Sequence, residues 1–112
     1  MSKFDEALAK YEAEAKKLNL KIDSSLLQAV AKGLGPSIYN ADSETIAGSD
    51  SEELKTVKNN FLIKKLGLAD GPALDKAIDE VMEQMGRSNR NKYRALVYSL
   101  LVMKFKKESV YG

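Results

Sequence analysis

The sequence contains no cysteine, no histidine and no tryptophan, and only two of its 112 residues are proline. Without cysteine the chain has no disulfide, no thiolate nucleophile and no cysteine-based metal site. Without histidine it lacks the commonest general base near neutral pH and the commonest metal ligand. We therefore expect no catalytic residues, no metal and no cofactor, although an enzyme that uses carboxylate and lysine groups stays open.

Long hydrophobic segments are also lacking. A helix that spans a membrane needs about 18 or more consecutive apolar residues, and the sequence has no such run. The N-terminal stretch MSKFDEALAKYEAEAKK is charged throughout and has neither the apolar core nor the cleavage site of a signal peptide. These features predict a cytoplasmic protein without a membrane partner.

The charges that are present are distributed unevenly. Residues 1–86 carry 11 lysines against 15 acidic residues, whereas residues 87–112 carry seven basic residues against one acid. The two parts have formal charges of −4 and +6, which together give the net charge of +2. All three arginines, Arg87, Arg90 and Arg94, lie in the basic part. A basic end on a weakly acidic body indicates either an anion-binding surface or internal neutralisation.

Apolar residues recur at spacings of three and four along most of the chain, which predicts helices. Capping residues, glycine and proline set the expected boundaries. Five helices are predicted, over about residues 3–18, 24–34, 50–66, 72–85 and 89–107, with an elbow at 36–40 that holds one short helical turn. No stretch of useful length alternates between apolar and polar residues as a strand would.

The last predicted helix has the least polar composition. From Ala95 to Met103 only Ser99 is polar, so apolar side chains face nearly every side of the helix. A helix that is apolar all round is usually buried. We therefore predict an all-α fold, with a single domain over residues 1–112 in which about five helices surround a central, largely buried C-terminal helix.

The arginine cluster lies where this last helix is expected to begin. With Ser88 or Asn89 as N-cap, Arg90 and Arg94 would lie one turn apart on one face. Free N–H groups at the helix start, the Ser88 and Asn89 side chains, and guanidinium groups that include Arg87 would then converge on a phosphate or carboxylate. The pattern predicts an anion-binding site at the helix start.

Two other interpretations of the cluster stay open. In one, Arg90 or Arg94 forms ion pairs within the protein. Candidate acids lie in the loop before residue 51 and on the preceding helix: Asp42, Glu44, Asp50, Asp79, Glu80 and Glu83. In the other, the cluster binds nucleic acid. Support for nucleic acid is limited, because the apolar part of the same helix must be buried and three further lysines lie at its far end.

Three stretches of the chain are similar to a known protein family. They are GLGPSIYNADSETIAGSD, ELKTVKNNFLIKKLGL and GRSNRNKYRA, and the chain closes on VYG. Over nearly its whole length the sequence resembles a family of small bacterial proteins catalogued as a domain of unknown function. The resemblance implies a bacterial, single-domain helical protein and carries over no catalytic residue. Because the family motif contains both the arginine cluster and the glycine–proline elbow, we expect Tyr39 and Asn40 to lie near Arg90 and Arg94.

Binding is the function that these features favour. We expect a non-enzymatic cytoplasmic helical module whose arginine-rich helix start engages an anionic ligand or an acidic protein surface. A nucleic-acid-binding protein is the first alternative. An enzyme that uses carboxylate and lysine groups is the second.

Overall fold

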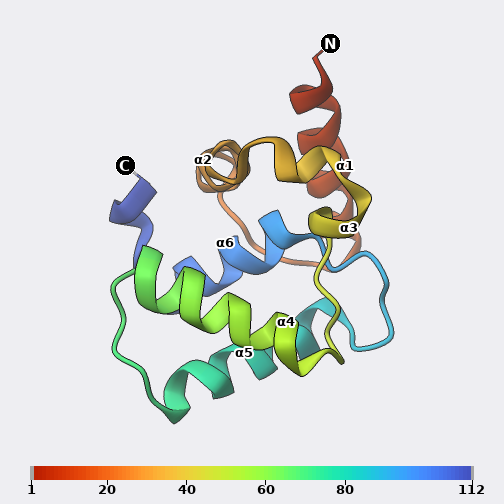
Figure 1. The fold of residues 1–112 in the computed structure, drawn as a ribbon. Coiled ribbons are helices and arrows are strands. Elements are labelled where there is room, and N and C mark those ends of the chain that lie inside the picture. Colours follow the sequence, from red (N-terminus) through yellow and green to blue (C-terminus); the bar gives the residue numbers. More distant parts are fainter. Residues whose placement is uncertain (1, 112) are drawn as a thin grey trace.

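The computed structural model describes residues 2–111 and shows an all-α fold (Figure 1). Within this range the α-helices are α1 (Lys3–Lys17), α2 (Ser24–Leu34), α3 (Ala41–Glu44), α4 (Ser51–Thr56), α5 (Pro72–Met85) and α6 (Arg94–Lys104). A π-helix, η2 (Val57–Lys65), continues α4, and two short 3₁₀-helices are η1 (Gly35–Tyr39) and η3 (Glu108–Tyr111). One isolated antiparallel bridge, between Thr45 and Tyr93, is the β-type pairing found among residues 2–111. The predicted fold class is confirmed.

Local capping signals fix the ends of α1, α2 and α5 near the predicted positions. The Ser2 hydroxyl accepts a hydrogen bond from the Asp5 N–H while the Asp5 carboxylate accepts one from the Ser2 N–H, a capping box that starts α1. The Asp23 carboxylate accepts from an N–H of the first turn of α2. Pro72 opens α5, and Gly86 ends it with a φ of +89°, a conformation that favours glycine.

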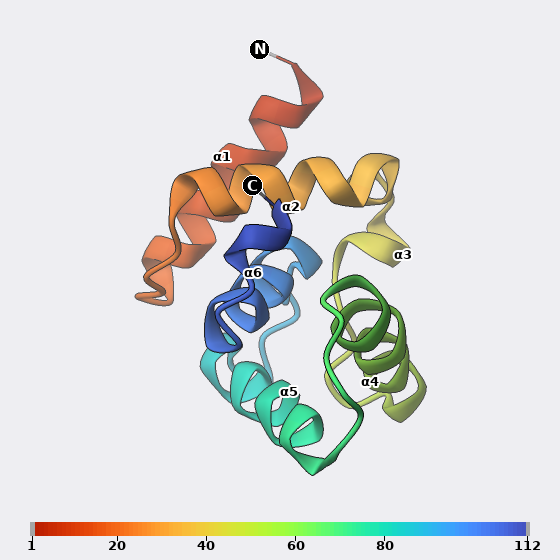
Figure 2. The ribbon, with the colours of Figure 1, turned by 90° about the vertical axis from the view of Figure 1, so that its left-hand side faces the viewer.

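Helix α6 forms the centre of the hydrophobic core. Every residue from Ala95 to Val102 is buried, as the apolar composition predicts. Figure 2 shows α6 between α2 on one side and α5 on the other, with η2 beside α5. The prediction of a central, largely buried C-terminal helix is confirmed.

The predicted start of α6 is wrong. The helix begins at Arg94 and not at Asn89. The Asn89 side chain does not cap a helix. Its amide nitrogen donates to the Glu14 carboxylate on α1 at 3.0 Å and to a carbonyl at the end of α5 at 2.9 Å. The chain then runs past Ile46, whose N–H donates to the Lys92 carbonyl at 2.9 Å. Contacts between residues distant in sequence thus hold this segment as a loop.

Two further boundaries differ from prediction. Helix α6 ends at Lys104 and not near residue 107, and Lys106 has a φ of +55°, which interrupts a right-handed helix. The acidic segment that was expected to be a loop contains the short helix α3. This helix begins because the Asn40 side chain accepts a hydrogen bond from the Asp42 N–H at 2.9 Å.

The third predicted helix is present, but its second half is π-helical. This segment buries Phe61 and Leu62 and leaves Asn59 and Asn60 exposed. Phe61 stacks on Tyr98 of α6, with 3.8 Å between the ring centroids. The π-helix thereby packs directly on the central helix.

Candidate functional site

A cleft lies between two loops that are distant in sequence. The 45–50 loop leads from α3 to α4 and the 86–93 loop leads from α5 to α6, and Figure 1 shows the two side by side. The hydrogen bond from Ile46 to Lys92 and the bridge between Thr45 and Tyr93 join their backbones. The cleft has a volume of about 520 Å³. Its polar lining includes Arg87, Ser88, Asn89, Arg90 and Lys92 from one side and Asp42, Asp50 and Glu53 from the other.

Arg87 lines the cleft, but its guanidinium is engaged by acids of α5. Nε donates to Glu83 at 2.7 Å, and the terminal nitrogen pairs with Asp79. The hydrogen bonds that Arg87 donates to Asp79 and Glu83 raise its pKa. The guanidinium is about half exposed, so water weakens these ion pairs and they add little to stability.

Arg94 occupies a different environment, because its side chain is only 12% exposed. Nε donates to the Ser43 carbonyl at 2.8 Å, one terminal nitrogen donates to the Tyr98 hydroxyl at 3.0 Å, and the other pairs with Glu53. Burial lowers the pKa of Arg94, and Tyr98 and Glu53 outweigh that effect, so that the pKa is raised.

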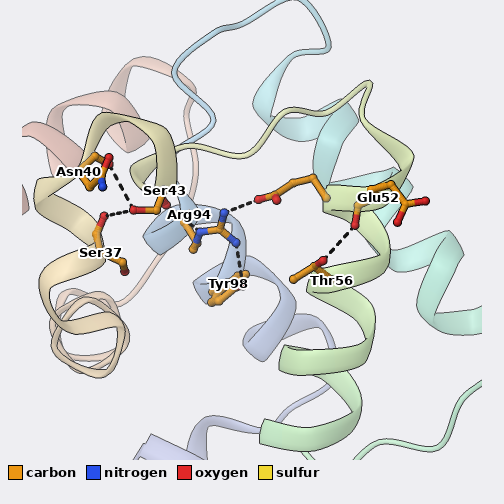
Figure 3. A network of polar contacts seen from close by, with 8 residues as sticks. Ser37, Asn40, Ser43, Glu52, Thr56, Arg94 and Tyr98 are labelled. Atoms are coloured by element: carbon orange, nitrogen blue, oxygen red, sulfur yellow. Dashed lines mark hydrogen bonds and ion pairs between the residues drawn. The ribbon is translucent and has the colours of Figure 1, made fainter.

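Figure 3 shows the network that surrounds Arg94. The Ser43 hydroxyl donates to the Ser37 carbonyl at 2.8 Å and lies 3.4 Å from the Asn40 carbonyl. Arg94 therefore connects α6 to α3, to the glycine–proline elbow and to α4. Removal of one member of such a partly buried network leaves the others without partners, which destabilises the fold.

Arg90 is the arginine that the fold leaves uncommitted. It is exposed and lines the cleft, and within residues 2–111 it makes neither an ion pair nor a side-chain hydrogen bond. Ser88 lies next to it in the same loop and is also exposed. This guanidinium is therefore free to bind an acidic group that enters the cleft.

Lys92 is buried without a carboxylate partner among the residues described, with 5% of its surface exposed. Nζ donates to the Arg87 carbonyl at 2.8 Å and to the Asn89 carbonyl at 2.6 Å. An ammonium group has three donors, so these two carbonyls leave one N–H for another acceptor. Burial, and then the positive charge of Arg87, lower the pKa of Lys92.

The side chains of the other predicted site residues either make contacts within the fold or lie outside the cleft. Asn89 lines the cleft, but its amide serves the contacts with Glu14 and α5. Asn40 caps α3. Tyr39, 48% exposed, does not line this cleft and instead borders a second hollow that includes Lys10. Among the hydrogen bonds of residues 2–111, the elbow is joined to the arginine cluster through Ser43 of α3, whose hydroxyl donates to the Ser37 carbonyl and whose carbonyl accepts from Arg94.

Acidic residues form the other side of the cleft. Glu53 pairs with Arg94, and the Asp50 carboxylate caps α4 by accepting from the Glu52 N–H at 3.0 Å. Asp42 is exposed, and in the described part of the chain it makes no ion pair. No group of three or more acidic side chains within residues 2–111 is arranged to hold a metal ion.

Lys92 is the candidate that sequence reasoning missed. Its only local signal is its position directly before Tyr93, where the buried segment begins. Its burial depends on the 45–50 loop, and the lysine stem would lie 3.1 Å from a Cβ atom placed on Gly48. Gly48 thus lets the two loops approach closely, which the sequence alone does not reveal.

Comparison with known proteins assigns the chain to a family. A search among curated proteins finds no match for the chain. Within residues 2–111 no helix is both long and apolar enough to cross a membrane. A family model described as "Protein of unknown function (DUF2853)" matches residues 10–109, a range that contains both loops of the cleft. The family resemblance is confirmed, and the chain belongs to the DUF2853 family of proteins of unknown function.

Proposed function

We propose that the protein is a non-enzymatic helical module that binds a small anionic ligand in the cleft between the 45–50 and 86–93 loops. One observation carries this proposal. Two cations, Arg90 and Lys92, line the cleft, and neither has a carboxylate partner in the described chain. Charge-assisted hydrogen bonds from such groups to a carboxylate or phosphate are short and strong.

The buried ammonium group of Lys92 supports binding of an anion. An ammonium group that leaves water without a negative partner loses solvation energy, and carbonyl oxygens compensate for only part of the loss. The fold holds Lys92 in this state, with two carbonyl acceptors and a third donor left over. A bound anion would supply the missing negative charge.

The anion site proposed here differs from the one that the sequence predicts. Because α6 begins at Arg94, the free N–H groups of its first turn are not next to Ser88 and Asn89. Binding in the cleft would therefore depend on side chains of the 86–93 loop, with Arg90 and Lys92 in the main roles.

An extended acidic partner is less well supported than a small anion. A nucleic-acid backbone or an acidic protein surface requires several free cations in a row. Arg87 pairs with Asp79 and Glu83, and Arg94 pairs with Glu53, so within residues 2–111 Arg90 is the one arginine of the cluster without an ion pair. A cytoplasmic location, a bacterial origin and the enzyme alternative stay predictions.

The test is a titration of the isotope-labelled protein with inorganic phosphate and with acetate, followed by amide chemical shifts. We expect shifts concentrated in residues 45–50 and 86–93. The variant Arg90→Gln should weaken binding about tenfold or more, which corresponds to about 1.4 kcal/mol. Lys64→Gln, which removes an exposed lysine on η2, is the matched control and should leave the affinity unchanged.

Two outcomes would contradict the proposal. One is the absence of cleft shifts with both anions at low ionic strength. The other is tight binding of a short DNA duplex whose affinity falls steeply with salt and is weakened as much by Lys64→Gln as by Arg90→Gln. That pattern indicates a dispersed phosphate-binding surface.

A further inference from the structure

The cleft has two sides of opposite charge. Three basic side chains, Arg87, Arg90 and Lys92, come from the 86–93 loop. Three acidic ones, Asp42, Asp50 and Glu53, come from α3, the 45–50 loop and α4. The lining as a whole is therefore formally neutral, so a simple anion that pairs with the basic side is also repelled by the acidic side.

The fold uses some of these charges and leaves others free. Glu53 pairs with Arg94, Arg87 pairs with acids of α5, and Asp50 caps α4. Within residues 2–111, Asp42 and Asp50 on the acidic side and Arg90 and Lys92 on the basic side make no ion pair, and the Asp42 carboxylate makes no hydrogen bond either. Asp42 and Arg90 are both exposed, and they do not pair with each other across the cleft.

The two loops are held at a fixed backbone separation by the Ile46–Lys92 hydrogen bond and the Thr45–Tyr93 bridge. The free charges on the two sides therefore face a shared space of about 520 Å³. This volume lies within the range of about 300–1,000 Å³ that is typical of small-molecule sites. A ligand with one positive and one negative group would pair with both sides, whereas a simple anion would pair with one.

From this arrangement we infer that the ligand is a small zwitterion, with a carboxylate that binds Arg90 and Lys92 and an ammonium group that binds Asp42. Amino acids and other small amino carboxylates have this chemistry. The inference rests on the proposed function, because it identifies the class of anion that the same cleft binds. The unpaired carboxylate of Asp42 repels the negative charge of a simple anion, and no ammonium group offsets that repulsion. This repulsion makes the cleft discriminate against simple anions.

The experiment is a titration with unbranched ω-amino acids from glycine to 6-aminohexanoate. Each is compared with the carboxylate of the same chain length that lacks the amine, and amide shifts and calorimetry report the affinity. Because the ligands differ in the distance between their ammonium and carboxylate groups, the chain length that binds most tightly reports the separation of the two charged sides of the cleft. We expect one chain length to bind at least tenfold more tightly than its matched carboxylate.

Variants show which side chain binds the ammonium group of the ligand and which binds its carboxylate. Asp42→Asn should remove the advantage of the amino acid and leave or improve the affinity for the plain carboxylate. Arg90→Gln should weaken both ligands. Glu12→Gln, which neutralises an exposed acid on α1 outside the cleft, is the matched control and should change neither affinity.

The outcomes separate the two proposals. If carboxylates bind in the cleft and no amino acid binds more tightly, the zwitterion inference is overturned while the proposed function stands. If neither class of ligand shifts the cleft amides, both are overturned. An advantage of the amino acid that survives in Asp42→Asn would also overturn the inference, because the ammonium group would then bind elsewhere.

Discussion

Helix α6 and the 86–93 loop are neighbours in sequence, yet different forces hold them in place. Residues 95–102 of α6 are all buried, and apolar contacts from α2 and α5 surround them. The loop is held by polar contacts, in which Asn89 reaches Glu14 and Lys92 binds two carbonyls of the loop itself. The contrast teaches that apolar burial fixes the helix, whereas the loop, which polar contacts hold in large part, keeps the exposed charge of Arg90 at the cleft.

The largest effect is expected in the centre of α6. Leu101 is completely buried, so Leu101→Ala removes packed methyl groups and leaves a cavity. We expect the free energy of unfolding, measured by urea titration, to fall by about 2–5 kcal/mol. A loss as small as that of an exposed loop variant would contradict the central position of this helix.

Arg94 lies at the junction between the helix and the loop. Arg94→Met removes the partner of Glu53 and the donors to Ser43 and Tyr98, and we expect a loss of about 1.5–3 kcal/mol. A double-mutant cycle with Glu53→Gln measures the pair alone. Additive losses in that cycle would show that the ion pair does not stabilise the fold.

The burial of Lys92 in the loop should be visible in the pH dependence of the free energy of unfolding. Its pKa in the folded protein is lower than the usual 10.5, so between these two pKa values the unfolded chain binds more protons than the folded one. The contribution of Lys92 to stability therefore rises with pH in this window. The free energy of unfolding of the wild type minus that of Lys92→Met should be constant at neutral pH and increase as the pH approaches 10.5.

Arg90 should give the smallest change in stability. Its side chain is exposed and makes no ion pair within residues 2–111, so Arg90→Gln should alter the free energy of unfolding by no more than about 0.5 kcal/mol. Thermal and urea unfolding measure this value on the same sample that is used for anion titration. A large destabilisation would mean that Arg90 serves the fold and not the cleft.

The sequence predicts those parts of the fold that local signals determine. Ser2 and Asp23 cap the first two helices, Pro72 and Gly86 bracket α5, and periodic apolar residues mark the buried faces. The start of α6 was misplaced because Asn89 resembles a cap, whereas its amide is used by Glu14, a residue 75 positions away.

The candidate site was less accessible to sequence reasoning. The pairing of Arg87 with Glu83 has the i, i+4 spacing of a helix neighbour, but the ion-pair alternative predicts Glu83 as a partner of Arg90 or Arg94 instead. The pairing of Arg94 with Glu53 spans 41 positions, and no local pattern indicates it. The burial of Lys92 requires the close approach of two loops, which depends on the complete tertiary structure.

The π-helix η2 has a consequence for variation in chain length. Its i→i+5 hydrogen bonds, such as that from the Leu66 N–H to the Phe61 carbonyl at 2.9 Å, enclose one residue more per turn than those of an α-helix. Asn59 and Asn60 are consecutive residues of this segment and both are exposed. We therefore expect the chain to tolerate deletion of one of these asparagines better than deletion of a buried neighbour, because the shortened segment has the residue count for α-helical hydrogen bonds between its ends.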